Sequence, residues 1–233
     1  DTDYVFHLAA EARIQPTLLN PILAAKSNML GTCTVLQCSR EAFVKRVIYS
    51  STSSAYGLKN IPPLQEDMTN DCLNPYSVTK TGGEELCKMY NKLFGLETVI
   101  FRYFNVYGPR QPLKGQYAPV VGIFLRQNKA NEPLTVIGDG HQRRDFTHVD
   151  DIVQANIAAA SSDNNIIIGN TINVGTGTNY SVLEVAEMIS DNIINLDPRE
   201  GEAQITLANN KRLKEWLGIH PKDRLKEFIN DNR

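Results

Sequence analysis

The sequence has little that would point to a membrane, a metal ion or a nucleic acid. No apolar run comes near the roughly 20 residues of a membrane span. The four cysteines lack C-x-x-C spacing, which disfavours a zinc site and is typical of reduced thiols. A formal net charge of -2 with scattered basic residues indicates no nucleic-acid surface. With 42% hydrophobic and 21% charged residues, the chain is predicted to be a soluble, cytoplasmic globular protein.

Apolar strand-like runs alternate with helical patterns along the first half of the chain. The runs Val5–Ala10, Arg46–Ser50 and Thr98–Tyr103 are separated by helical spacing in Asn20–Ala42 and in 75–94. This alternation implies right-handed crossovers and a parallel sheet, with ligands beyond the carboxyl ends of the strands. The predicted fold class is α/β, with a Rossmann-like doubly wound parallel sheet.

After Gly108 the segments shorten and glycine and proline recur. Helices are expected over Asp150–Ser161 and Ser181–Asn192, and strands over Leu134–Ile137 and Thr171–Val174. This change divides the chain into a first domain, 1–108, and a smaller α/β lobe, 109–233, interleaved with it. The division rests on the density of turn-forming residues.

Two local patterns are interpreted as structural. Gly175-Thr176-Gly177 follows a strand but lacks the third glycine of a dinucleotide loop, so we interpret it as a tight turn before the helix that Ser181 starts. His7 and His148 stand in apolar or helix-start contexts, and we expect structural hydrogen bonds from both.

Three separated segments carry the groups that hydride chemistry on an alcohol requires: Ser50–Gly57, Pro75–Lys80 and Arg102–Arg110. Tyr76 and Lys80 lie at i and i+4, so they share one face of a helix that Asn74 can cap. A free phenol, with a pKa of about 10, is a poor base at neutral pH, and a lysine charge favours the phenolate. Thr52, at a strand end, can share the same substrate oxygen. We therefore predict Thr52, Tyr76 and Lys80 as the catalytic residues.

With these motifs the chain resembles the extended short-chain dehydrogenase/reductase family, and within it the NAD-dependent nucleotide-sugar epimerases and dehydratases. Besides the segments above, the matching motifs are His7–Arg13, Asn28 with Gly31-Thr32, Gly138-Asp139-Gly140, Arg144-Asp145-Phe146, Asn173–Gly177 and Arg199-x-Gly201-Glu202. The resemblance covers nearly the whole chain. It makes 1–108 a partial NAD-binding Rossmann domain that carries the catalytic residues, and 109–233 mainly a nucleotide-sugar-binding lobe.

The resemblance also implies which residues bind each ligand. The cofactor NAD is expected to contact Ala9, Ala10, Asn28, Ser50, Tyr76, Lys80 and Tyr103. The nucleotide sugar is expected to contact Asn105, Val120, Arg144, Arg199 and Glu202. Arginines suit a diphosphate because the guanidinium offers donors in a fork, and a glutamate can accept from a ribose hydroxyl. Asp145 is expected to orient Arg144.

Departures from the family pattern favour one reaction. The dehydratases carry an Asp-Glu pair after the strand-end threonine, and the decarboxylating members carry a glutamate, where this chain has Ser53 and Ser54. Neither hydroxyl replaces a carboxylate. The prediction is therefore 4-epimerisation through a transient 4-keto sugar, with a dehydratase, a decarboxylase or a non-catalytic nucleotide-sugar binder as the alternatives.

The sugar and the assembly are predicted from fewer residues. Thr206 stands where some epimerases carry a bulky aromatic, so the pocket is expected to admit UDP-GlcNAc/UDP-GalNAc or UDP-Glc/UDP-Gal. A homodimer is expected through the helices 20–42 and 76–94, with Met29, Cys33, Cys87 and Tyr90 compatible with that face.

No glycine-rich phosphate loop precedes the first strand. That loop holds the cofactor pyrophosphate in the family, so we expect the chain to be an N-terminally truncated piece. We also expect it to bind NAD weakly and to be inactive on its own.

Overall fold

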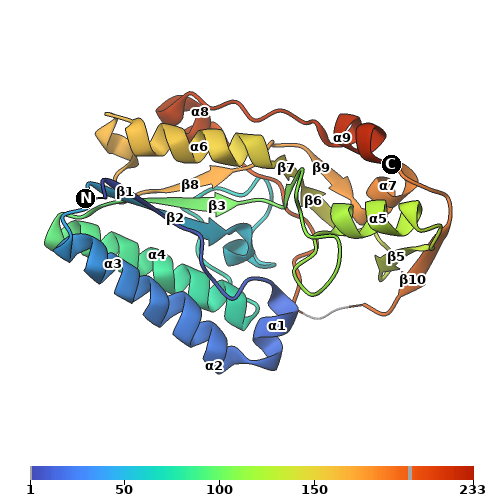
Figure 1. Cartoon of the computed structure of the whole chain (residues 1–233), viewed down its shortest axis with the longest axis horizontal. Coiled ribbons are helices and arrows are strands. Elements are labelled where there is room, and N and C mark those ends of the chain that lie inside the picture. The colour runs from blue at the N-terminus through green and yellow to red at the C-terminus, as the bar shows by residue number, and fades with distance from the viewer. Residues whose placement is uncertain (1, 199–200) are drawn as a thin grey trace.

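The computed structural model describes residues 2–198 and 201–233 and is built around one parallel sheet (Figure 1). Its four strands lie in the order β1-β2-β3-β8, with β1 Tyr4–His7, β2 Arg46–Thr52, β3 Glu97–Tyr103 and β8 Thr171–Val174. All three pairings are parallel. Because side chains alternate along a strand, the fully buried β2 sends one set of apolar residues to each face of the sheet.

Helices cover both faces, which confirms the doubly wound arrangement (Figure 1). On one face α3 (Gly31–Glu41) and α4 (Pro75–Phe94) pack over Val47 and Tyr49. On the other face α6 (Val149–Ser161) and α8 (Lys211–Leu217) pack over Ile48 and its neighbours. The sheet therefore holds its carboxyl ends at one edge, where ligands of such folds bind.

The predicted helix over 20–42 forms as three consecutive pieces after the short α1 (Ile14–Leu19). These are α2 (Pro21–Ala24), the π-helix η1 (Ala25–Leu30) and α3. The apolar spacing could not reveal the π segment, since one widened turn leaves the same face buried. Such segments are frequent at functional sites, and Asn28 lies within this one.

The boundaries of α4 follow from local signals, as predicted. The Asn74 side chain accepts from the Ser77 amide in a capping box, Pro75 occupies the first turn, and Gly95 ends the helix at φ 71°. Gly83 lies in mid-helix because a Cβ there would be 2.2 Å from the Tyr49 hydroxyl. Helix and strand therefore approach closely, which fixes the first turn of α4 beside the end of β2.

The second lobe has its own core, formed by α5 (Val120–Lys129), α7 (Val182–Glu187) and α9 (Leu225–Asn232) against the parallel pair β5 and β10. The remaining short elements are η2 (Ser53–Tyr56), β4 (Val106–Tyr107), β5 (Leu134–Ile137), β6 (Arg143–Asp145), β7 (Thr147–His148), η3 (Asn165–Ile167), β9 (Asn179–Ser181) and β10 (Ile193–Leu196).

The helix predicted over Ser181–Asn192 is too long. It ends at Glu187, because the chain turns to add β10 to β5. After Gly108 the chain also returns to the first sheet with α6, β8 and α8. The division into two domains at that residue stays a prediction.

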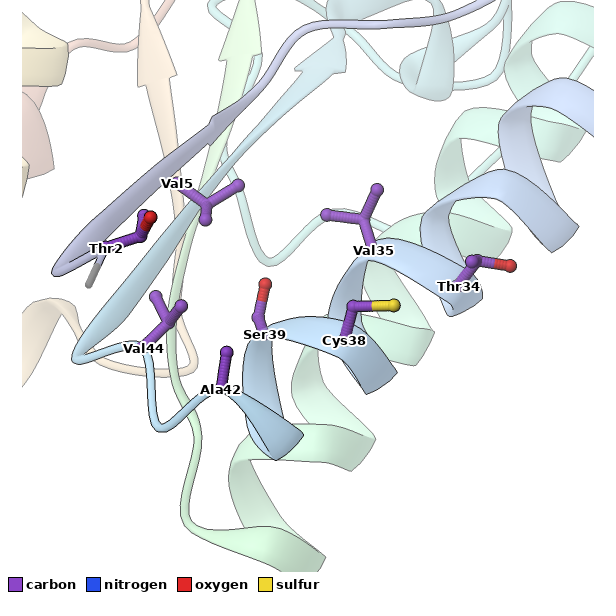
Figure 2. A pocket seen from close by; sticks show the side chains of 8 residues that line it. All are labelled: Thr2, Val5, Thr34, Val35, Cys38, Ser39, Ala42 and Val44. Carbon is purple, nitrogen blue, oxygen red and sulfur yellow. The ribbon is translucent and has the colours of Figure 1, made fainter.

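Among the described residues, strand β1 pairs with β2 and with no other strand. Beside it lies an apolar groove of about 320 Å³, shown in Figure 2 and lined by Thr2, Val5, Thr34, Val35, Cys38, Ser39, Ala42 and Val44. Phe6, on β1, and Leu8, just after it, are exposed as well. Across the part of the chain that the structure describes, no helix has the length and hydropathy needed to cross a membrane.

Candidate active site

The end of β2 and the first turn of α4 bring Thr52 and Tyr76 together, as the motifs predicted. The Thr52 hydroxyl, which accepts from the Ser54 amide at 3.1 Å, lies near the Tyr76 phenol. Burial raises the pKa of Tyr76, while the Thr52 hydroxyl and the positive charge of Arg13 lower it. The phenol is thus protonated before a ligand arrives, with a hydroxyl and a cation already beside it.

Lys80 lies one turn later on α4 and is only 3% exposed. Its ammonium is 4.4 Å from the centroid of the Tyr49 ring. Burial lowers the pKa of Lys80 to about 8, against the opposing charges of Cys87 and Glu84. The positive charge of Arg13 lowers the pKa of Tyr76, and the expectation that Lys80 favours the phenolate stays a prediction.

The Lys80 ammonium makes no hydrogen bond to any residue within 2–198 or 201–233. An ammonium has three donors, and those that the protein leaves free can take an acceptor. A ribose hydroxyl of a bound dinucleotide would supply one at this edge of the sheet. By this test the residues present fit NAD.

The loop after β1 is held at the same edge by Asn28. The Asn28 amide donates to the Glu11 carbonyl at 3.0 Å and to Thr79 at 2.9 Å, and its oxygen accepts from the Glu11 amide at 2.8 Å. All its groups are used by protein, so Asn28 positions the loop that carries Ala9, which is exposed, and Ala10, which is half-buried.

Both histidines of interest make structural hydrogen bonds, as expected. His7 is paired with Thr32 at 2.9 Å, and His148 accepts from the Asp150 amide at 3.3 Å. Burial and the Lys80 charge lower the pKa of His7 to about 4, which keeps this ring neutral at physiological pH.

Ser50 and Tyr103 lie next to each other on neighbouring strands. Ser50 donates to the Tyr103 hydroxyl at 3.3 Å, and Asn156 of α6 donates to the same oxygen at 2.8 Å. Both side chains therefore point to the face that α6 covers. Asn156 was not identified from sequence, because it stands within an apolar helix and has no motif around it. The cofactor roles of Ser50 and Tyr103 stay predictions.

A buried ion pair ties together the three elements that carry the motifs. Glu84, on α4, accepts from Arg102, on β3, at 2.9 and 2.7 Å. Ser51, beside Thr52 on β2, also donates to Glu84, and Arg102 donates to Asn70 at 2.7 Å. Sequence reasoning missed this network because its members lie far apart along the chain.

The residues predicted to hold the nucleotide sugar lie in the second lobe, apart from Asn105, which belongs to the first domain. Asn105 is half-buried between β3 and β4, and Val120 begins α5. Arg144 donates to Glu202 at 3.3 Å, so these two predicted ligands are brought together. Arg199 lies outside the described residues. The roles of these residues toward the substrate stay predictions.

Thr206 is buried, and its hydroxyl accepts from the Asp145 amide at 3.3 Å. That oxygen is therefore engaged with the backbone. The structure gives no support to the argument that a small side chain here opens the sugar pocket, and this role also stays a prediction.

Asp145 does not orient Arg144, contrary to expectation. Its fully buried carboxylate accepts from the Thr176 amide and hydroxyl at 2.9 and 2.7 Å, and from the amides of Gly177 and Ala208 at 2.9 and 3.1 Å. Burial raises the pKa of this carboxyl despite those bonds. The Gly175-Thr176-Gly177 turn is thus occupied by an internal carboxylate, which confirms the interpretation of the turn as structural.

Arg13 is the second residue that sequence reasoning missed. It follows the Ala9–Ala10 loop, and its guanidinium donates to the Tyr117 carbonyl at 2.9 Å. A cation in a loop at the carboxyl edge was the available signal. No group of His, Cys, Asp and Glu side chains within the described ranges could hold a metal ion.

Residues 1–175 match the NAD dependent epimerase/dehydratase family. The chain belongs to this family. It is 33% identical over 234 residues to the UDP-glucose 4-epimerase of Mycolicibacterium smegmatis, covering 97% of this chain and 74% of that protein.

Two solved structures of this family have the same fold. UDP-glucuronic acid 4-epimerase from Bacillus cereus, in complex with UDP-glucuronic acid and NAD, matches with a TM-score of 0.91 and 33% identity, over 99% of this chain and 74% of that one. UDP-N-acetylglucosamine 4-epimerase from Methanobrevibacter ruminantium M1, in complex with UDP-N-acetylmuramic acid, gives 0.91 and 33%, over 100% and 76%. The three relatives are all 4-epimerases by name, and their sugars differ.

Proposed function

We propose that this chain carries the active site of an NAD-dependent nucleotide-sugar 4-epimerase. The observation that carries the proposal is the Thr52–Tyr76 pair at the carboxyl edge of the sheet, with Lys80 buried beside it. A phenol and a hydroxyl that share one substrate oxygen are what reversible oxidation of a secondary alcohol needs.

The cofactor would lie along the edge formed by the Ala9–Ala10 loop and α4, with Lys80 donating to it. When bound, NAD supplies a reversible acceptor for the hydride on C4 of the sugar. Its positive nicotinamide would also favour the Tyr76 phenolate, which burial alone disfavours. The protein then has to hold the sugar so that either face of C4 can lie against the nicotinamide.

In the first half of the reaction Tyr76 accepts the proton of the C4 hydroxyl as C4 becomes a ketone. The 4-keto sugar then rotates so that its other face lies against the cofactor. In the second half the phenol returns that proton to the C4 oxygen. Thr52 donates to the same oxygen in both halves and keeps it in line with the phenol. One proton carrier therefore serves both directions, and the overall reaction is an isomerisation.

The two residues that follow Thr52 are serines, so the chain has no carboxylate at these positions. Eliminating water from C5 and C6 requires an acid and a base. Ser53 and Ser54, which occupy the positions of the missing carboxylates, form the start of η2 beside Thr52. This arrangement supports epimerisation over dehydration or decarboxylation.

Arg144 and Glu202 are the proposed contacts for the diphosphate and ribose, together with Arg199. In the absence of ligand Arg144 already pairs with Glu202, so a diphosphate would compete for the same guanidinium. The proposed sugars are UDP-GlcNAc/UDP-GalNAc or UDP-Glc/UDP-Gal.

A cytoplasmic homodimer is the proposed form of the protein. Ile22, Leu30, Leu93 and Phe94 expose apolar side chains on the α2–η1–α3 and α4 layer, which supports an interface there. Cys87 and Tyr90, by contrast, are buried in the core of the first domain, so core packing explains them. Light scattering of the purified protein tests the dimer.

The test of the function is the rate of UDP-sugar epimerisation by Tyr76→Phe, measured in the longest reading frame that contains this chain, because the chain by itself is expected to be inactive. Removing the proton carrier should lower kcat by about a hundredfold to ten thousandfold, with KM little changed. Tyr90→Phe is the matched control, since it removes a hydroxyl from the far end of the same helix. A Tyr76→Phe enzyme as fast as this control would refute the assignment. Nucleotide-sugar binding without turnover in the wild type would instead indicate a binding protein.

A further inference from the structure

Asn74 makes hydrogen bonds in two directions with one side-chain amide. Its oxygen accepts from the Ser77 backbone amide at 2.9 Å, which caps α4, and its nitrogen donates to the Gly201 carbonyl at 2.9 Å. The residue is only 5% exposed. These partners fix the orientation of the amide, because the reversed one would set donor against donor and acceptor against acceptor. A planar, buried amide of this kind holds its two partners at a fixed separation.

The first partner belongs to the helix turn that carries the reacting phenol. Tyr76 stands two residues after Asn74, in the first turn of α4. The backbone amides of a first turn have no partner within the helix, so a cap decides how firmly that turn is held. Ser77 adds a second bond, from its hydroxyl to the Asn74 carbonyl at 2.9 Å. The backbone from which Tyr76 projects is therefore fixed relative to Asn74.

The second partner belongs to the segment proposed to hold the nucleotide. Gly201 precedes Glu202, which accepts from Arg144 at 3.3 Å. Gly201 has φ 79°, a conformation that favours glycine. A Cβ built on it would lie 3.8 Å from the Cβ of Asn74 and 3.7 Å from Ile14 of α1. The chain at Gly201 thus lies against α1 and against the start of α4, although it belongs to the second lobe.

Beyond Gly201 the same segment is bound to β6 of the second lobe. The Arg143 amide donates to the Gln204 carbonyl at 2.9 Å, and the Thr206 amide donates to the Arg143 carbonyl at 3.0 Å. Leu64 of the first domain joins the chain further on, by donating to the Leu207 carbonyl at 2.7 Å. The Asn74 bond therefore acts at the end of the segment that carries Glu202, and it ties that end to the helix of Tyr76.

We propose that Asn74 is a positioning residue that sets the separation between the Tyr76 phenol and the nucleotide end of the substrate. The inference rests on the proposed 4-epimerase function, in which the phenol acts at C4 and the nucleotide is attached at C1. Because one molecule spans both points, the bond from Asn74 to Gly201 determines whether C4 arrives in line with the phenol. A displacement of about 1 Å at such a point can cost about a hundredfold in rate.

Two substitutions separate this role from helix capping. Aspartate and serine cap a helix about as well as asparagine, so Asn74→Asp and Asn74→Ser keep the bond to the Ser77 amide. An ionised carboxylate has no donor for the Gly201 carbonyl, and a serine hydroxyl that accepts from Ser77 is too short to reach it. Asn74→Ser removes the link without adding a charge, so agreement between the two variants excludes an effect of charge.

Asn164 offers a matched control at another place in the fold. Its side-chain oxygen accepts from the Ile166 amide at 3.2 Å, and its nitrogen donates to the Trp216 carbonyl at 3.1 Å. It therefore joins η3 to α8 with the same two bonds that join α4 to Gly201. Because η3 precedes β8, this link lies at the amino ends of the strands, away from the edge where Thr52 and Tyr76 lie. Asn164→Asp removes the donor there.

The experiment measures kcat and KM for UDP-sugar epimerisation, and the Kd for UDP by calorimetry. All proteins are made in the longest reading frame that contains this chain. Both Asn74 variants should lower kcat by about tenfold to a hundredfold, while KM and the Kd for UDP change by less than about threefold. UDP ends before the sugar, so its affinity does not depend on the distance to Tyr76, and it also reports that the variants are folded. Asn164→Asp should keep the wild-type constants.

Three results would overturn the inference in distinguishable ways. If both Asn74 variants epimerised as fast as Asn164→Asp, capping would be the whole role of Asn74. If they lost affinity for UDP while kcat stayed unchanged, Asn74 would serve nucleotide binding and not the placement of Tyr76. In both cases the wild type still epimerises, so the proposed function stands. A wild type that converts no UDP-sugar would overturn the proposed function and the inference together.

Discussion

Replacing Glu84 by glutamine should cost far more stability than replacing the neighbouring Glu85. Both carboxylates form an ion pair at 2.7 Å, Glu84 with Arg102 and Glu85 with Lys88. The side chains of the first pair are 0% and 3% exposed, and those of the second 66% and 39%. The two substitutions therefore compare the loss of a buried ion pair with the loss of a solvent-exposed one.

The magnitude follows from what Glu84→Gln leaves behind. The Arg102 guanidinium would stay buried without a counter-charge, and its Nη1 already lacks a partner. Ser51 would lose an ionised acceptor as well. Breaking a buried pair by removing one partner costs about 3–5 kcal/mol. For a chain of this size that is a fall in Tm of about 6–20 °C. Glu85→Gln should stay within about 0.5 kcal/mol of the wild type.

The assay is urea denaturation of the wild type, Glu84→Gln, Arg102→Met and the double variant. Because the double variant removes both charges, it should be less destabilised than the sum of the singles, with a coupling of about 2–3 kcal/mol. The slope of the free energy of unfolding against urea concentration should not change, so a shift of the urea midpoint reports a change in stability. A Glu84→Gln variant as stable as Glu85→Gln would refute the claim that this pair holds β2, β3 and α4 together.

Two further predictions concern His7, on β1, and Gly83, on α4. Between pH 6.5 and about pH 4, His7 binds a proton in the unfolded chain but not in the folded one, because its pKa in the folded protein is about 4. The free energy of unfolding should therefore fall by about 3 kcal/mol as the pH drops through this range. Urea midpoints of His7→Gln should lack that loss, and an equal loss in both proteins would exclude His7 as its source. Gly83→Ala should destabilise by about 1–3 kcal/mol despite better helix propensity, because its Cβ would overlap the Tyr49 hydroxyl. Thermal unfolding of Gly82→Ala, whose Cβ meets the flexible end of Met29, is the control, and an equal effect of the two would contradict the packing argument.

Local signals in the sequence were enough to predict much of the first domain. The cap at Asn74, the proline at the first turn and the glycine at position 95 act within a few residues of the helix they delimit, and α4 has those limits. The strands β2 and β3 were found for the same reason, since a fully buried parallel strand is a short apolar run. The pairing of Thr52 with Tyr76 then follows from the order of strand and helix.

Features set by distant contacts were not predicted. The helix α7 ends early because Ile193–Leu196 pairs with β5. The local sequence does not predict this pairing. Arg13 and Arg144 look alike in sequence, yet one is drawn to the Tyr117 carbonyl and the other to Glu202. The Asp145 carboxylate accepts from the amides of Thr176 and Gly177 and not from Arg144. Such choices depend on which groups the folded chain brings within hydrogen-bonding distance.

The central claim is that this site moves a hydride from C4 of a nucleotide sugar and returns it to the other face. A proton NMR time course of the longest reading frame that contains this chain, with NAD and UDP-sugars in D₂O, tests this most directly. The account predicts a C4 epimer whose C4 still carries protium, since the hydride never exchanges with solvent, and conversion at least about a hundredfold slower by Tyr76→Phe. Deuterium at C4 of the product, or a 6-deoxy methyl signal, would contradict it.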